Sequence, residues 1–259
     1  MEPIRCFEGT MQPHQPFWAV RNANESKSGD PELEFYGYIS EYSWFGDEIT
    51  PAAFKNDLYN LGKGGPVTIR INSGGGDVIA SSVIRSTLLD YPGHVTVRID
   101  GLAASAAVIV AMAGKKILIQ DTAYMMIHDP AFSVLMAVLD IETLGQMQAQ
   151  LKAIKTGIVD TYAAKTGISQ DRLKRMMTDE TWMSANEAVN FGFADEVIVQ
   201  ASGKQNAAAK NVANAAVINS LRSYRNLPVD LQEMLNPETP DIQNQMAMER
   251  LRAEIKLYV

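Results

Sequence analysis

The sequence predicts an α/β fold in which parallel strands alternate with helices. Residues 66–72, 95–99 and 116–120 are rich in β-branched side chains, and each stretch predicts a buried strand. The first two are followed by apolar stretches with helical character, at 78–89 and about 104–113. Strands that alternate with helices imply crossover connections, which join parallel strands, so the class is α/β.

The preceding and following segments extend this alternation. Residues 35–39 predict an earlier strand, and Thr50 followed by Pro51 predicts the cap and the first turn of a helix. Between Asp140 and about Thr166, apolar residues recur at helical spacing over a long span. This pattern predicts a long helix that projects from the domain.

Capping signals predict the end of the folded part. Ser169 is expected to cap a short helix, and Ser184 with Glu187 three residues later matches a capping box. Residues 194–199 then return to a strand pattern.

We expect three regions along the chain. Residues 1–33 contain prolines and a polar run, which predict a partly flexible N-terminal arm. Residues 34–200 form the folded domain. Residues 201–259 form an appendage, with a low-complexity linker rich in Ala and Asn and then an amphipathic helix near 246–258.

Composition limits the classes of function. The 259 residues carry a net charge of -7, with 46% hydrophobic and 20% charged residues, as in ordinary folded domains. The negative charge argues against a nucleic-acid partner. The single cysteine, Cys6, cannot form an internal disulfide, and the apolar run 102–113 is too short to cross a bilayer. We therefore expect a cytoplasmic protein with no membrane association.

Ser105 is the first candidate for chemistry. It lies among small residues within 101–107, where a strand is expected to give way to a helix, so its hydroxyl is uncovered. Free N–H groups in the first helical turn favour developing negative charge at such a position. A plain helix cap is the commoner role of a serine there and is the alternative.

His128 is the candidate general base. It follows the apolar strand 124–127 and precedes Asp129, so it should emerge at the same edge of the sheet as Ser105. Taken alone, it fits a core histidine satisfied by the backbone equally well. The serine favours the catalytic interpretation, because a hydroxyl needs a neighbouring base to lose its proton.

Two further segments contribute candidates. Residues 72–77 place three glycines between a strand and a helix, which permits a backbone to approach a ligand closely, although a tight turn is the alternative. Asp179 and Glu180 are candidates for a carboxylate that orients the imidazole. Acidic residues ahead of a helix are often only dipole partners or solvated charges.

Together these segments resemble the ClpP family, the proteolytic subunits of Clp proteases, and more narrowly the ClpP-like proteases of phages and prophages. The likeness runs from about 34 to 199, and four blocks carry it, at 71–76, 101–105, 125–130 and 181–195. One block alone has little specificity, whereas four in the family's order are highly specific.

The resemblance implies a fold and a set of roles. The fold is the spiral of ββα units shared by ClpP and crotonases, with residues 140–166 as the handle helix that joins two rings. Ser105 would be the nucleophile and His128 the base, with the backbone N–H groups of Gly76 and Ala106 as the oxyanion hole.

The third member of the triad departs from the family pattern. The family places an aspartate two residues before the aromatic residue of the last block, and Glu180 stands there, with Asp179 one residue earlier. A glutamate can hold an imidazole as an aspartate does, so Glu180 is expected and Asp179 is the alternate.

The resemblance also implies a substrate cleft. Residues from about Phe132 to Val138, among them Ser133 and Val134, would pair as an edge strand with an extended peptide, close to Gly75. No metal or organic cofactor is implied. The partners are a polypeptide substrate and further copies of the chain in stacked rings.

The expected function is hydrolysis of peptide bonds by a phage or prophage protease that cuts capsid or scaffold proteins in the host cytoplasm. The arm and the tail after Gln200 have no counterpart in housekeeping ClpP, so docking of an unfoldase ATPase is not implied. Three alternatives stay open: a housekeeping Clp subunit fed by an ATPase, a crotonase-like acyl-CoA enzyme, and an inactive ring-forming structural protein.

Overall fold

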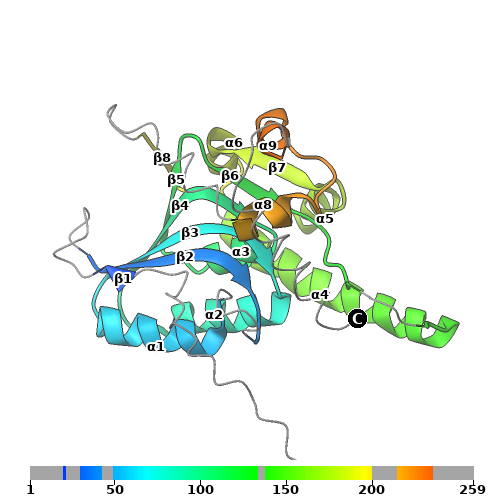
Figure 1. Cartoon of the computed structure of the whole chain (residues 1–259), viewed down its shortest axis with the longest axis horizontal. Coiled ribbons are helices and arrows are strands. Elements are labelled where there is room, and N and C mark those ends of the chain that lie inside the picture. The colour runs from blue at the N-terminus through cyan, green and yellow to red at the C-terminus, as the bar shows by residue number, and fades with distance from the viewer. Residues whose placement is uncertain (1–19, 22–29, 43–48, 134–137, 200–214, 236–259) are drawn as a thin grey trace, which may run out of the picture.

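A computed structural model describes residues 20–21, 30–42, 49–133, 138–199 and 215–235. Its centre is an eight-stranded sheet in the order β1-β2-β3-β4-β5-β8, to which β6 and β7 are joined through β4 (Figure 1). The strands are β1 (Val20–Arg21), β2 (Glu32–Ile39), β3 (Val67–Gly76), β4 (Val95–Ala104), β5 (Lys116–Gln120), β6 (Tyr124–Ile127), β7 (Thr181–Ser184) and β8 (Glu196–Ile198). The helices are α1 (Pro51–Gly62), α2 (Val78–Asp90), α3 (Ala106–Ala111), α4 (Ile141–Thr166), α5 (Gln170–Thr178), α6 (Ala185–Asn190), α8 (Ala215–Leu221) and α9 (Val229–Met234).

The strands β2, β3, β4, β5 and β8 are parallel, as the sequence predicts. Among the described strands, β1 runs antiparallel to β2, and β7 runs antiparallel to β6. The short β1 lies in the predicted N-terminal arm, so part of that arm adds an edge strand to the sheet. Helices connect the parallel strands, which gives the α/β class.

β4 is the branch point of the sheet. Its first half pairs with β5 over Thr96–Ile99, and its second half pairs with β6 over Leu102–Ala104. The prediction of a helix from about residue 104 is therefore wrong at its start, because the chain stays extended to Ala104 and α3 covers Ala106–Ala111. Hydrogen-bonding partners offered by β6 outweigh the helix propensity of alanine here.

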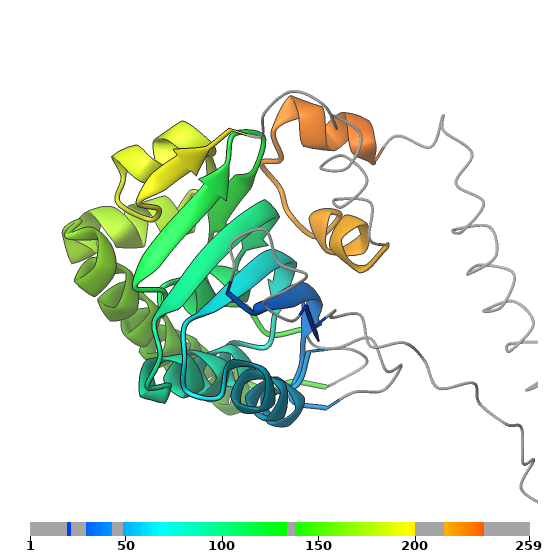
Figure 2. The same ribbon diagram turned by 90° about the vertical axis from the view of Figure 1, so that its left-hand side faces the viewer.

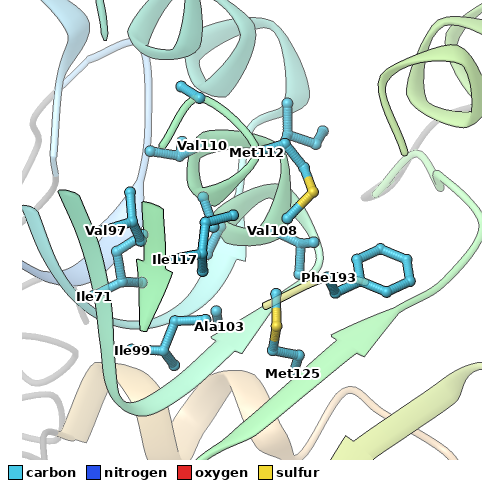
Figure 3. Close-up of a cluster of buried hydrophobic side chains, with 14 of the residues drawn as sticks. Ile71, Val97, Ile99, Ala103, Val108, Val110, Met112, Ile117, Met125 and Phe193 are labelled. Carbon is cyan, nitrogen blue, oxygen red and sulfur yellow. The ribbon is translucent and has the colours of Figure 1, made fainter. Parts of the chain in front are cut away.

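The main hydrophobic core lies between one face of the sheet and the helices α1 to α6. Figure 3 shows part of it, where Ile71, Val97 and Ile99 of the strands lie near Val108 of α3 and Met112 just after it. Alternate residues of each strand contribute to this core, as the two-residue period of a strand requires.

The opposite face of the sheet carries a second, smaller apolar cluster. Ala103 faces the main core, whereas its neighbours Leu102 and Ala104 belong to this second cluster. Met125 likewise belongs to the main core, and its neighbour Met126 belongs to the second cluster. The second cluster includes residues of the segment 215–235, which therefore packs on the face away from the main core.

The predicted helix boundaries agree with the capping side chains. Thr50 caps α1, and Ser184 with Glu187 forms the capping box of α6. Asp140 caps the 26-residue helix α4, whose N-terminal half projects from the domain (Figure 1), whereas Ile158, Val159 and Tyr162 of its C-terminal half pack in the main core. The helix predicted near 246–258 lies outside the described residues. None of the helices in the described part of the chain is long and apolar enough to cross a membrane.

Candidate active site

Ser105 lies at the junction of β4 and α3, in a backbone conformation that residues other than glycine seldom adopt. Its φ is 55° and its ψ is -123°, and its side chain makes no capping hydrogen bond, so the role of a plain helix cap is not supported. Its N–H donates to the Met126 carbonyl at 2.8 Å. Such conformations cost about 1–3 kcal/mol and persist where the surrounding structure imposes them, often at functional sites.

His128 follows β6 and brings its imidazole to Ser105. The Nε2 atom lies 2.7 Å from Ser105 Oγ, so the two share a hydrogen bond. β4 and β6 run in the same direction with Ala104 in register with Met126. Chain segments that leave the carboxyl ends of paired parallel strands emerge at one edge of the sheet. The structure thus brings together the two residues that the sequence predicted to meet.

The surroundings of His128 favour a neutral imidazole. Burial lowers the pKa of His128, the carboxylates of Glu180 and Asp129 raise it, and Arg225 lowers it, with a net shift downward. A neutral imidazole can accept a proton from a neighbouring hydroxyl at neutral pH.

Of the two candidate carboxylates, Glu180 is the one that is buried and whose charge acts on His128. Glu180 is 4% exposed and acts on the imidazole electrostatically, whereas Asp179 is exposed at the end of α5. Glu180 Oε1 accepts hydrogen bonds from the backbone N–H groups of Arg225 and Asn226, both at 2.7 Å. Within the described residues, no hydrogen bond joins Glu180 to His128.

The glycine loop at the end of β3 lies against the Ser105 turn. A Cβ built on Gly75 would lie 2.9 Å from Ser105 Cβ and 3.0 Å from Ala106 N, and a Cβ on Gly76 would lie 2.1 Å from the Ile39 carbonyl oxygen. Both glycines have positive φ, so conformation and space alike exclude a side chain. The predicted oxyanion donors, the N–H groups of Gly76 and Ala106, therefore belong to segments in contact.

Ser73 holds this loop in place and was not singled out from the sequence. Its Oγ donates to the Gly37 carbonyl at 2.6 Å and accepts a hydrogen bond from Gly75 N at 3.1 Å. Ser73 is fully buried, so these two bonds satisfy a hydroxyl that has no access to water.

The predicted substrate-binding strand is described only at its start. Phe132 and Ser133 follow the His128 segment and are exposed, and residues 131–133 form no strand. Val134 lies outside the described residues.

Residues 215–235, which we name the C-terminal cap, consist of α8, a turn and α9, the orange helices of Figure 2, and they contact this site through Tyr224. Leu102, Ala104 and Met126 of the domain form one buried apolar cluster with four cap residues, namely Val217, Leu221, Leu227 and Leu231. Tyr224 of the cap lies beside the His128 ring, with the two ring centroids 5.4 Å apart and an interplanar angle of 81°. Sequence reasoning missed this contact, although Val217 and Leu221 are spaced four residues apart, as are Leu227 and Leu231.

The arrangement is suited to nucleophilic chemistry at an alcohol. A hydroxyl hydrogen-bonded to a neutral imidazole can lose its proton as it attacks an electrophilic carbon. Across the part of the chain that the structure describes, no group of three or more His, Cys, Asp or Glu side chains is placed to hold a metal ion.

Residues 57–201, more than half of the chain, match the family model described as Clp protease. The chain belongs to the Clp protease family. It is therefore a serine-type peptidase, and its α/β architecture is the ClpP-like fold. The family match contains Ser105, His128 and Glu180 and ends before the C-terminal cap.

Relatives of this Clp protease include two named proteolytic subunits. The ATP-dependent Clp protease proteolytic subunit 1 of Protochlamydia amoebophila is 30% identical over 154 residues, which cover 58% of this chain and 73% of that protein. Subunit 2 of Thermobifida fusca is 30% identical over 135 residues, which cover 51% and 64%. A solved structure of a ClpP1 mutant from Listeria monocytogenes has a TM-score of 0.57 at 24% identity and covers 65% of this chain and 91% of that chain. At that identity it supports the fold alone.

Proposed function

We propose that this Clp protease cleaves peptide bonds with Ser105 as nucleophile, His128 as general base and Glu180 as the carboxylate that orients the imidazole. The main support is the 2.7 Å separation between Ser105 Oγ and His128 Nε2. The burial of Glu180 near the imidazole is further support, and the exposure of Asp179 makes it the less suitable acid.

The reaction follows from these positions. His128 Nε2 takes the proton of Ser105 as Oγ bonds to the carbonyl carbon of the substrate, and the N–H groups of Gly76 and Ala106 hold the resulting oxyanion. The imidazolium then gives its proton to the leaving amine as the peptide C–N bond breaks. Water then attacks the ester carbon as His128 takes its proton, and the imidazolium returns a proton to Ser105 Oγ as the Oγ–C bond breaks, which releases the carboxylic acid and regenerates both residues. No cofactor takes part.

Labelling with a fluorophosphonate probe tests the nucleophile. The wild-type chain should be labelled at Ser105, as shown by mass spectrometry of the labelled peptide. Ser105→Ala should abolish labelling while the circular dichroism spectrum stays unchanged. Labelling that persists in Ser105→Ala would identify another nucleophile.

The finer role is maturation of a phage capsid in the host cytoplasm, through cleavage of capsid or scaffold proteins. Its support is the resemblance to phage and prophage ClpP-like proteases, together with residues 1–33 and 201–259, nearly all of which lie outside the family match at 57–201. Gly75 with Phe132, Ser133 and Val134 would then contact the extended polypeptide substrate.

A housekeeping role is the second candidate, because the relatives above are named ATP-dependent Clp protease proteolytic subunits. Hydrolysis of casein separates the two. Cleavage by the purified chain alone supports a stand-alone protease, whereas cleavage that requires an added Clp unfoldase and ATP supports the housekeeping role.

The remaining alternatives have less support. The family match argues against a crotonase-like acyl-CoA enzyme, and the hydrogen bond between Ser105 and His128 argues against an inactive structural protein. Assembly into stacked rings through α4 is part of the proposal, and its support is the projecting, exposed N-terminal half of that helix.

A further inference from the structure

The C-terminal cap reaches directly into the space around the Ser105–His128 pair. The Tyr224 hydroxyl donates to the Gly74 carbonyl at 2.6 Å, on the glycine loop that faces the nucleophile turn. Its ring stands edge to face on the His128 ring. Trp182 also packs against the Tyr224 ring, with the two ring centroids 5.7 Å apart. Burial raises the pKa of Tyr224. Tyr224 therefore contacts both the glycine loop and the imidazole that is hydrogen-bonded to Ser105.

The cap also binds the carboxylate that the triad needs. Oε1 of Glu180 accepts the N–H groups of Arg225 and Asn226, and the Asn226 side chain donates to the Asp179 carbonyl at 2.9 Å. A carboxylate held by two backbone donors is strongly stabilised in that position. As long as the cap is in place, Glu180 is committed to the cap and makes no hydrogen bond with the imidazole of His128 within the described structure.

The cap depends on packing against the domain for the stability of its helices. Its helices α8 and α9 contain seven and six residues, lengths that form no stable helix alone in water. Its apolar residues belong to the small second cluster and not to the main core. A short segment that packs outside the main core can open at a lower free energy than the domain unfolds.

We propose that the C-terminal cap is an autoinhibitory element of this protease, which blocks Ser105 with Tyr224 and diverts Glu180 from His128. Peptide substrate gains access when the cap detaches, and Glu180 is then free to turn to the imidazole. This proposal rests on the proposed peptidase function of Ser105 and His128. The active site is occupied by a segment of the chain itself, so activation requires displacement or removal of residues 215–235.

Two substitutions in α9 give a matched test in the full-length chain. Leu231 is 6% exposed in the second cluster, whereas Val229, two residues earlier, is 70% exposed. Leu231→Asp should detach the cap and raise the rate of fluorophosphonate labelling at Ser105 at least about tenfold, which requires the open fraction to rise by the same factor. Val229→Asp adds the same charge to the same helix and should leave the rate within about twofold of wild type, since surface substitutions have small effects.

A second variant acts at the site itself. Tyr224→Ala removes the ring from His128 and should also accelerate labelling, while Ser105→Ala should remain unlabelled. Hydrogen exchange in residues 95–127 should be unchanged in Leu231→Asp and Tyr224→Ala, and exchange in 215–235 should be faster in Leu231→Asp, which shows that only the cap has opened.

The possible results distinguish a failure of the cap proposal from a failure of the proposed peptidase function. Equal labelling of Ser105 in all variants except Ser105→Ala would show that the cap does not block the site. Slower labelling in Leu231→Asp and Tyr224→Ala would show that the cap completes the site. Either result would overturn the inhibitory role of the cap and leave the peptidase function of Ser105 standing. Absence of Ser105 labelling in every variant, with intact exchange in 95–127, would instead overturn the peptidase function and the cap's role with it.

Discussion

At the scale of single residues, the proposed mechanism makes the reactivity of Ser105 depend on the protonation state of His128. A protonated imidazole cannot accept the Ser105 proton, so reactivity is present above the pKa of His128 and is lost as pH falls through it. Burial lowers that pKa below its ordinary 6.5, Glu180 and Asp129 oppose this, and Arg225 adds to it. We expect the acid limb of the labelling rate at Ser105 to have its midpoint below pH 6.5. A pH profile with its midpoint above that value would contradict the environment described for His128.

The choice between Glu180 and Asp179 is tested by removing one charge at a time. Both substitutions are made in the Leu231→Asp background, so that the cap is detached in each. Glu180→Gln should lower kcat/KM for a peptide substrate by roughly 10²-fold or more, because a triad without its carboxylate loses the orientation and stabilisation of the imidazolium. Asp179→Asn should stay within a few-fold of the parent, since Asp179 is exposed. A larger loss in Asp179→Asn would reverse the assignment.

At the scale of elements, a buried network of charges ties β2, β3 and β4 together on the sheet face away from the main core. Arg70 of β3 lies 2.6 Å from Asp100 of β4 and 3.1 Å from Glu34 of β2. Arg98 also pairs with Asp100, at 2.6 Å. Burial of several carboxylates on neighbouring strands is tolerated because Arg70 bridges them.

Removal of Arg70 should therefore destabilise the domain strongly. Arg70→Met leaves buried carboxylates without their shared cation, and the free energy of unfolding in urea should fall by about 3–5 kcal/mol. Lys116→Met is the matched control, because Lys116 and Glu196 pair at 2.8 Å on the surface with about half of each side chain exposed. Its cost should be below about 1 kcal/mol. Similar losses in the two variants would mean that the buried network contributes no more than a surface pair.

Elements that carry a strong local signal could be predicted from the sequence, whereas those defined by a tertiary partner could not. The β-branched alternation of 66–72 and the caps at Thr50 and Ser184 are local features, and each agrees with the structure. Residues 102–104 are a leucine and two alanines, which favour a helix as readily as a strand, and their pairing with β6 makes them a strand. α8 and α9 are short helices whose stability comes from packing on the sheet, so the cap's place over the site has no local signature.

In the candidate active site too, some features could be predicted from the sequence and others depend on tertiary partners. Ser105 and His128 could be placed together from the sequence, because parallel strands bring their carboxyl ends to one edge of a sheet. The hydrogen bonds of Glu180 to Arg225 and Asn226 could not, because they join residues more than forty positions apart through a segment without a recognisable motif.

At the scale of the whole molecule, the long helix α4 carries apolar side chains into solvent. Ile141 is 90% exposed and Leu144 is 51% exposed, both in the first turn of the projecting half. Exposed large apolar residues that cluster on one element commonly mark an interaction surface. A second copy of the chain is the partner we propose, because α4 corresponds to the helix through which rings of the family are expected to stack.

The combined substitution of Ile141→Asp and Leu144→Asp tests this assembly. Carboxylates in place of both side chains oppose burial of this surface against another copy, so stacked rings should separate. Light scattering should then show a mass that is about half that of the wild-type assembly, since two equivalent rings become one. Gln146→Asp adds charge at a neighbouring exposed position of α4 without removing an apolar side chain, and its mass should match the wild type. An unchanged mass in the double variant would show that α4 does not hold the copies together, and labelling of Ser105 in the same sample would show whether assembly matters for reactivity.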